Sequence, residues 1–326
     1  MNLLVFNLVN TARNLFRQEK YDEALKFLNR AFEKSNNTDE KIEILYDKAM
    51  MLDYINLDEE ALSVYKLISR LDLRDAAAMY GQAMIYEKMS EYEKSVKCYK
   101  ACIKMDPEYD RAYFFLANLY DVMKEYDKAI YYYKKAMELA PDDIMIYNNL
   151  GAIYENIKEY DKALEMLDKA ISIDSEYFRP FFNKGVVYGK LKETEKALDY
   201  YRIAIEKNPN YNNNYLNMSA LFIEDKRYED ALEILNKGID NATDRAYLYY
   251  NRACIRIKMN NKDLSLIDLN KSIQLDPDLK EFSRNDPDFY DLREDVRFKA
   301  ITGDNDDIFE ERRRNKGDGR SGRNIM

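Results

Sequence analysis

Residues 144–177 read IMIYNNLGAIYENIKEYDKALEMLDKAISIDSEY, and these 34 residues contain the pattern that decides the fold. Pro141 stands just before them, and prolines also occupy positions 107, 209 and 277. The gaps between these four prolines are 34 residues or twice 34. A fixed period of this length is typical of helix–turn–helix repeats that stack into an array. The period therefore predicts an all-α protein.

Two columns of small residues repeat with the same period. With Asp110 as position 1, copies begin at residues 5, 42, 76, 110, 144, 178, 212 and 246, and three extra residues lengthen the first copy. Position 8 holds Ala12, Ala49, Ala83, Ala117, Gly151, Gly185, Ser219 and Ala253, and position 20 holds Ala24, Ala61, Ser95, Ala129, Ala163, Ala197, Ala231 and Ser265. Two helices approach closely only where no bulky side chain stands between them. These columns therefore predict the crossing points of helix pairs.

The larger residues of the quoted stretch complete a family pattern. They are Tyr147, Leu150, Gly151 and Tyr154, followed by Ala163, Leu167 and Ala170. This pattern resembles the tetratricopeptide repeat (TPR) family. The resemblance implies an array over residues 1–279 that forms a right-handed superhelix of antiparallel helix pairs, with eight repeats at 5–41, 42–75, 76–109, 110–143, 144–177, 178–211, 212–245 and 246–279. The chain departs from the family pattern in having no Trp and in carrying Arg256 where Tyr or Phe is usual.

The residues after the eighth repeat divide into two parts. Residues 280–302 contain Asp-Pro-Asp-Phe and then apolar residues at helical spacing, so we expect a turn and one capping helix over the end of the array. Residues 303–326 are rich in Gly, Asp, Asn and Arg without an apolar period, so we expect a disordered polar tail. Its basic residues between positions 312 and 323 leave RNA or acidic lipid open as partners, but the interleaved acids favour a solubilising role.

Composition excludes several classes of function. The chain has no His, so neither a His-dependent triad nor a zinc–histidine site can form. No phosphate loop of the GxxxxGKS or GxGxxG type occurs. We therefore expect no enzyme activity, no cofactor and no small-molecule substrate. The net charge is −9, from 51 basic and 60 acidic residues, which makes nucleic acid an unfavourable partner.

The cysteines and the apolar segments point to an ordinary core. Cys102 occupies position 27, where most copies have Ala, Gly or Ser, so Cys98, Cys102 and Cys254 are expected to be core residues and not a metal or redox site. No segment approaches the ~20 apolar residues that span a bilayer. The start lacks the basic leader of a secretory signal. We expect a cytoplasmic protein with no membrane partner.

The first helix of each repeat carries the strongest functional signal. In TPR arrays these helices line a concave groove, and the resemblance places positions 2, 5, 6, 9, 12 and 13 on it. Position 6 is Asn in five copies, namely Asn10, Asn149, Asn183, Asn217 and Asn251. Because an amide side chain offers both donors and an acceptor, it can pair with a peptide backbone. The last four resemble the asparagine ladder in the TPR domain of O-GlcNAc transferase, and the alternative is a consensus residue inherited by repeat duplication.

Neighbouring positions on the same helices supply charge and apolar area. Arg111 and Arg179 are cations, and Phe114, Phe182 and Tyr250 are apolar anchors. The sequence thus favours a non-catalytic scaffold that holds an extended segment of another protein in its groove. The alternative is a regulatory or substrate-recruiting subunit of an enzyme complex whose catalytic chain is encoded separately. The sequence does not name the partner in either case.

Overall fold

The computed structural model describes residues 2–303, and within them the regular structure is helical, with no strand. The chain divides into two compact units, Met1–Ile157 and Lys158–Met326. The predicted polar tail, with its basic residues, lies outside the described residues apart from Gly303. The predicted all-α class is confirmed.

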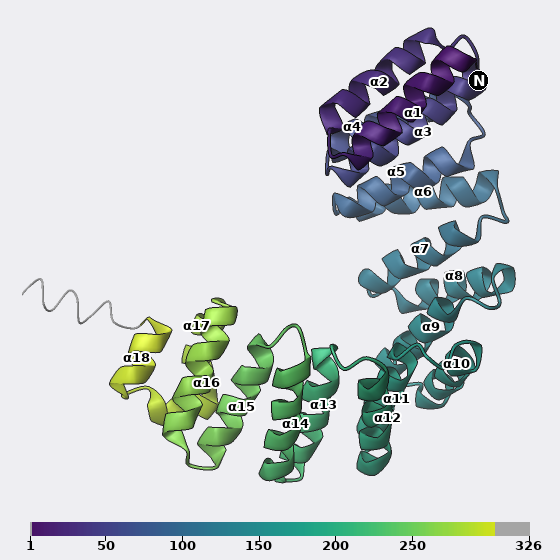
Figure 1. Cartoon of the computed structure of the whole chain (residues 1–326). Coiled ribbons are helices and arrows are strands. Elements are labelled where there is room, and N and C mark those ends of the chain that lie inside the picture. The colour runs from purple at the N-terminus through teal and green to yellow at the C-terminus, as the bar shows by residue number, and fades with distance from the viewer. Residues whose placement is uncertain (1, 304–326) are drawn as a thin grey trace, which may run out of the picture. The chain divides into compact units, whose positions relative to one another are not determined.

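The first unit is a succession of antiparallel helix pairs (Figure 1). Its described helices are α1 (Leu3–Arg17), α2 (Tyr21–Lys34), α3 (Thr38–Tyr54), α4 (Asp58–Leu71), α5 (Ala76–Lys88), α6 (Tyr92–Met105), α7 (Asp110–Val122), α8 (Tyr126–Leu139) and α9 (Ile144–Asn156). From α1 to α9, each helix packs against the next one along the chain. The odd-numbered helices of this unit are therefore the first helices of the predicted repeats, and the even-numbered ones are the second helices.

The second unit continues the same arrangement of pairs. Its repeat helices are α10 (Tyr160–Ile173), α11 (Arg179–Lys190), α12 (Thr194–Lys207), α13 (Asn212–Glu224), α14 (Tyr228–Asn241), α15 (Ala246–Lys258) and α16 (Lys262–Leu275). Consecutive helices pack against each other, and α13 also contacts both α11 and α15. The first helices α11, α13 and α15 therefore lie side by side.

Small residues let the helices of a pair approach, as predicted. Ala117 of α7 and Ala129 of α8 are both fully buried. In the second unit, a Cβ atom added to Gly185 of α11 would lie 2.6 Å from the ring of Tyr201 on α12. The ring of Tyr201 fills the space beside the crossing, so only a residue without a side chain fits at Gly185.

The turn inside each repeat uses a left-handed residue at position 15. Eight described residues other than Gly have φ between 59° and 65°, namely Glu19, Asn56, Ser90, Lys124, Lys158, Lys192, Lys226 and Asn260. At the end of α7, the N–H of Lys124 donates to the carbonyl of Asp121 at 2.8 Å, and the N–H of Glu125 donates to the carbonyl of Tyr120 at 2.8 Å. These two bonds close the C-terminus of the helix, and the left-handed residue makes them possible.

Positions 11 and 23 face each other inside a pair. In the pair α11–α12 they are Tyr188 and Tyr200, whose rings stack with centroids 5.3 Å apart. In the pair α15–α16 they are Arg256 and Asp268, joined by an ion pair of 2.6 Å. Arg252 also donates two hydrogen bonds to the carboxylate of Asp268, which is 1% exposed. The departure from the family pattern at Arg256 is therefore accompanied by a second departure at Asp268, and in this pair an ionic contact replaces the contact between two aromatic rings.

The capping segment contains the predicted turn and helix, and one more short helix precedes them. It consists of α17 (Leu279–Asn285), the 3-10 helix η1 (Pro287–Leu292) and α18 (Val296–Thr302). Phe289, Leu292 and Phe298 are buried in the same apolar cluster as the core of α15 and α16. Pro287 supplies no N–H for a helix continuing from α17, and the Asp286 side chain accepts a hydrogen bond from the N–H of Asp288, so a new turn begins there. The segment still covers the last repeat, as expected.

None of the helices between residues 2 and 303 combines the length and the apolar character that crossing a bilayer would require.

Candidate functional site

Three amides of the predicted row lie on neighbouring first helices of the second unit. Asn183 is on α11, Asn217 on α13 and Asn251 on α15, and all three are half-buried. Asn217 Nδ2 donates to the Tyr201 hydroxyl at 3.4 Å, and Asn251 Nδ2 donates to the carbonyl of Tyr247 at 2.8 Å. The Oδ1 atoms of Asn217 and Asn251 accept no hydrogen bond from the described residues. They remain available to a donor such as a peptide N–H.

Asn149 differs from these three because its amide is engaged inside the first unit. Its Nδ2 donates to Asn118 Oδ1 at 3.1 Å and to the Tyr133 hydroxyl at 3.0 Å. Its Oδ1 accepts from Asn148 Nδ2 at 3.2 Å. Tyr133 in turn hydrogen-bonds Asn118. Both donors of Asn149 are thus satisfied by the fold, and the residue connects α9 to α7 and α8.

An arginine and three aromatic rings gather at the start of α11. The guanidinium of Arg179 lies 5.7 Å from the ring centroids of both Phe178 and Tyr211. Phe182, one turn further along α11, packs edge-on against Tyr211 at 5.2 Å. Arg179 is exposed and Phe182 is half-buried. The predicted site residues Arg179, Phe182 and Asn183 therefore belong to one helix face.

Arg111 and Phe114 belong to the first unit, on α7. Arg111 is exposed and lies close enough to Tyr80 for its charge to matter: burial raises the pKa of Tyr80 to about 12, and the cation of Arg111 opposes this rise. Phe114 is half-buried and packs edge-on against Phe115 and Tyr133, with centroids 5.2 Å and 5.8 Å away. Both residues belong to the first compact unit, whereas Asn183, Asn217 and Asn251 belong to the second.

Tyr250 corrects the sequence-based assignment of an exposed anchor. Its side chain is only 5% exposed, and its hydroxyl donates to Asp286 at 2.5 Å. Its ring packs against Phe282 and Phe289 of the capping segment. The sequence placed Tyr250 on a groove-facing position of α15, but the capping segment covers that end of the helix. Tyr250 therefore stabilises the cap instead of offering surface to a ligand.

A cavity on the first helices of the first unit was missed by sequence reasoning. It measures about 400 Å³, and its lining includes Met84 of α5 and Phe115, Leu119 and Val122 of α7. Position 6 is Phe115 here and not Asn, so the face changes from amide to apolar. Phe115 at position 6, where five other repeats have Asn, is the feature of the sequence that could have indicated this cavity.

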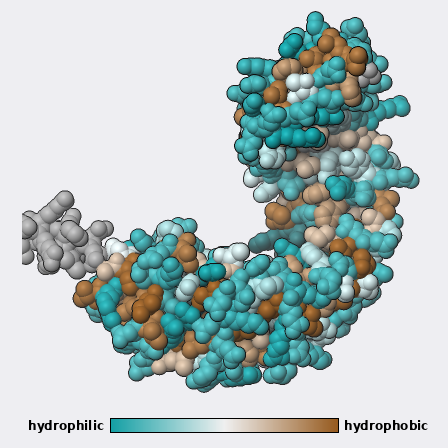
Figure 2. All heavy atoms as spheres, viewed as in Figure 1, coloured by the Kyte–Doolittle hydropathy of each residue, from teal (hydrophilic) through white to brown (hydrophobic). Residues whose placement is uncertain are grey.

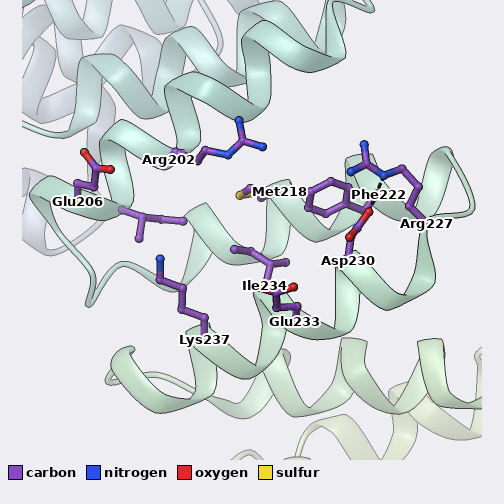
Figure 3. Close-up of a pocket in the computed structure, with 10 residues that line it drawn as sticks. Arg202, Glu206, Met218, Phe222, Arg227, Asp230, Glu233, Ile234 and Lys237 are labelled. Atoms are coloured by element: carbon purple, nitrogen blue, oxygen red, sulfur yellow. Dashed lines mark hydrogen bonds and ion pairs between the residues drawn. The ribbon is translucent and has the colours of Figure 1, made fainter.

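A second cavity lies between the helices α12, α13 and α14 (Figure 3). It measures about 380 Å³, and buried Met218 and Phe222 of α13 form part of its floor. Charged side chains surround it: Arg202, Glu206, Arg227, Asp230, Glu233 and Lys237. Arg227 donates to Asp230 at 2.6 Å and covers the ring of Phe222 at 4.6 Å. The charges of this rim balance one another, so the rim favours neither an anionic nor a cationic ligand.

The cysteines are core residues, as predicted. Cys98, Cys102 and Cys254 are buried and unpaired. Burial, assisted by nearby Asp106, raises the pKa of Cys102 to about 12, and burial also raises the pKa of Cys98 and of Cys254. A protonated, buried thiol is a poor nucleophile and metal ligand. Among residues 2–303, no three His, Cys, Asp or Glu side chains form a group that could hold a metal ion.

The visible surface is mostly hydrophilic, with hydrophobic side chains scattered between charged ones (Figure 2). Hydrophobic residues gather near the C-terminal elements, where Phe282 and Val296 are 58% and 69% exposed.

The sequence model of the tetratricopeptide repeat matches residues 76–109, 110–143, 144–177 and 179–211, and a second model of the same repeat matches 246–279. The matched segments follow the predicted repeats closely. No curated protein matches the chain.

Solved structures resemble the chain at the level of the fold. A chain of the APC/C hetero-tetramer Cut9–Hcn1 superposes with a TM-score of 0.55 at 18% identity, over 90% of this chain and 55% of that one. The PilF protein of Pseudomonas aeruginosa superposes with a TM-score of 0.52 at 20% identity, over 65% of this chain and 99% of that one.

Family models thus match five repeats that together make up more than half of the sequence. The structure adds helix pairs of the same design before the matched segments, in α1 to α4, and between them, in α13 and α14. Proteins built from these repeats are generally non-catalytic scaffolds for protein–protein interaction. The chain belongs to the tetratricopeptide repeat family.

Proposed function

We propose that this scaffold holds an extended segment of a partner protein along the first helices α11, α13 and α15. The observation that carries the proposal is the row of half-buried amides Asn183, Asn217 and Asn251 on three helices that lie side by side. One amide per repeat, all at position 6, presents polar groups at regular intervals. A peptide backbone also presents its N–H and C=O groups at regular intervals, so the two can pair without reading side chains.

Arg179 and Phe182 stand at one end of this row and supply the selectivity. Their charge and apolar area select for an acidic group and an apolar side chain on the partner. Asn149, Arg111, Phe114 and Tyr250 are left out of this site, because the first three belong to the other unit and Tyr250 is covered by the cap.

The test is a parallel affinity capture with three immobilised proteins. The first is the full chain, and the second carries Asn183→Ala, Asn217→Ala and Asn251→Ala together. The third carries Asn241→Ala and Asn270→Ala, two exposed amides on the second helices α14 and α16. Partners held by the row should be recovered on the first and third proteins and depleted on the second.

Titration of the recovered partner then measures the loss of affinity. With ~1 kcal/mol for each lost hydrogen bond, three substitutions weaken binding by up to roughly two orders of magnitude. Equal affinity for all three proteins, with unchanged circular dichroism, would place the partner elsewhere on the chain.

A further inference from the structure

The first helices of the first unit carry an apolar surface that the fold leaves open. Met84 of α5 and Val122 of α7 are 39% and 60% exposed, although both line the cavity of about 400 Å³. Phe115 and the fully buried Leu119 line the same cavity. We refer to these four residues as the apolar pocket. Its volume of about 400 Å³ leaves room for one large side chain.

A row of carboxylates runs beside the apolar pocket. Position 12 of the successive first helices α3, α5, α7 and α9 holds Asp53, Glu87, Asp121 and Glu155. In the second unit the same position holds Gly189, Ile223 and Ile257, so the acidic row is confined to the first unit. Glu87 and Asp53 also line the cavity itself.

The acidic row has little positive charge to balance it. Lys88 is the one cation lining the described cavity, and its Nζ lies 3.0 Å from Asp53 and 2.7 Å from Asp58. Glu87 accepts a hydrogen bond from the Tyr99 hydroxyl at 3.0 Å and forms no ion pair with a described residue. Asp121 likewise has no ion-pair partner among residues 2–303, and burial raises the pKa of both carboxyls. Such half-buried carboxylates gain stability when a cation docks on them.

We propose that the apolar pocket and the acidic row together bind a partner segment in which one large apolar side chain is flanked by Lys or Arg. The apolar side chain enters beside Phe115 and Leu119, while the flanking cations pair with Glu87 and Asp121. This surface lies in the other unit from the amide row and uses a different chemistry, so it goes beyond the peptide site proposed above. The chain would then hold two unlike segments at once.

The experiment uses the full chain and three fluorescein-labelled peptides of defined sequence. GSKKFKKSG carries the apolar anchor between cations, GSEEFEESG reverses the charge, and GSKKSKKSG removes the anchor. Fluorescence anisotropy should show that GSKKFKKSG binds at least about tenfold more tightly than either of the other two. Comparable binding of GSKKFKKSG and GSKKSKKSG would mean that charge alone attracts the peptide, which would overturn the proposal.

Two variants locate the binding on this surface. Glu87→Gln combined with Asp121→Asn should weaken binding of GSKKFKKSG by about tenfold. Val122→Ser should weaken it as well and should also reduce the preference over GSKKSKKSG. Glu224→Gln combined with Asp225→Asn removes two exposed acids at the end of α13 in the second unit and serves as the matched control for net charge, so it should leave binding unchanged.

Circular dichroism and the melting temperature of each variant separate a loss of binding from a loss of fold. Unchanged affinity in the folded double variant, or no binding of GSKKFKKSG up to about 1 mM, would overturn the proposal. Neither result touches the amide row, whose test uses substitutions in the second unit only.

Discussion

Lys124 lies two residues beyond the end of α7 and has a backbone φ of 60°, in a region that residues with a side chain rarely adopt. The same conformation recurs at position 15 of every repeat, where Glu, Asn, Ser and Lys occupy it. A left-handed conformation costs a residue with a Cβ roughly 1–2 kcal/mol relative to Gly. The helix C-terminus requires it nevertheless, because two closing hydrogen bonds depend on it.

Lys124→Gly should therefore raise the free energy of unfolding. Part of the relieved strain is offset by the greater entropy of Gly in the unfolded chain, so we expect a net gain of about 0.5–1 kcal/mol. Lys124→Ala is the matched control, since Ala keeps the Cβ and should give no gain. Urea denaturation of the three proteins measures the difference, and an equal effect of Gly and Ala would show that strain is not its source.

Asn149 and Asn251 occupy the same position of their repeats but differ in their contacts. Asn149→Ala removes two donors and one acceptor from a half-buried network, so we expect a loss of about 1–3 kcal/mol. Asn251→Ala removes one bond to the backbone of its own helix and should change stability by less than about 0.5 kcal/mol. Equal losses in thermal denaturation would contradict this assignment of roles.

The contrast between these two asparagines shows that the sequence pattern predicts the position of a residue in its helix but not its hydrogen bonds. The period placed both at position 6 of a first helix, and the structure agrees. The hydrogen-bonding of Asn149 depends on Tyr133 and Asn118, which come from different helices and which no local pattern connects to it. The left-handed conformation of position 15 could not be predicted from the sequence for another reason. Most repeats have Lys, Glu or Ser there, and these residues are not typical of that conformation.

At the scale of the element, the packing of a helix pair depends on what fills the crossing. Gly185→Ala in α11 would place a methyl group 2.6 Å from the Tyr201 ring, so the ring or the helix must shift. Overpacking of this kind destabilises by about 1–3 kcal/mol. Gly189→Ala in the same helix meets its nearest atom, on Leu221, at 3.7 Å and should stabilise by roughly 0.5–1 kcal/mol because Ala favours the helix. Denaturant titrations measure the free energy of unfolding, which should fall for Gly185→Ala and rise for Gly189→Ala. A loss of stability in both variants would contradict this prediction.

The pair α15–α16 depends on a buried carboxylate in place of stacked rings. Asp268→Asn leaves Arg252 and Arg256 without their common anion, and we expect a loss of about 3–5 kcal/mol. Asp263→Asn is the matched control in the same helix, because its ion pair with Arg297 is exposed and should contribute less than about 1 kcal/mol. Calorimetry that found similar melting temperatures for both variants would argue against a structural role for the ionic contact.

The sequence identified Arg256 as a departure but not its consequence. A single column of the period shows that an aromatic residue is missing. Only the pairing of positions 11 and 23 shows that Asp268 compensates for it, and this pairing depends on how two helices face each other. The short helix α17 was not predicted for a related reason, because residues 279–285 carry no apolar period of their own and their place depends on packing against the last repeat.

At the scale of the whole molecule, the repeat period was sufficient to predict the class and the order of the pairs. The family models do not match residues 5–75 or 212–245, yet helix pairs occupy both stretches. The small residues of positions 8 and 20 are present there, and they are what the packing requires. The division into two units could not be predicted, since the period runs through it without interruption.

Removal of the capping segment should destabilise the end of the array that it covers. A chain that ends at residue 278 loses Leu279, Phe289, Leu292 and Phe298, all buried against the last repeat. Each such side chain contributes about 1.5–3 kcal/mol by burial, and its removal also exposes apolar surface of α15 and α16. Because stability in a repeat array is a sum of local terms, the loss should concentrate at that end. Hydrogen exchange should therefore show lost protection in α15 and α16 first, with α11 and α12 affected least. A chain that ends at Gly303 is the control and should keep the exchange pattern and the melting temperature of the full chain. If both truncations exchange alike, the three capping elements do not stabilise the array and the apolar cluster around Phe289 does not contribute as its burial implies.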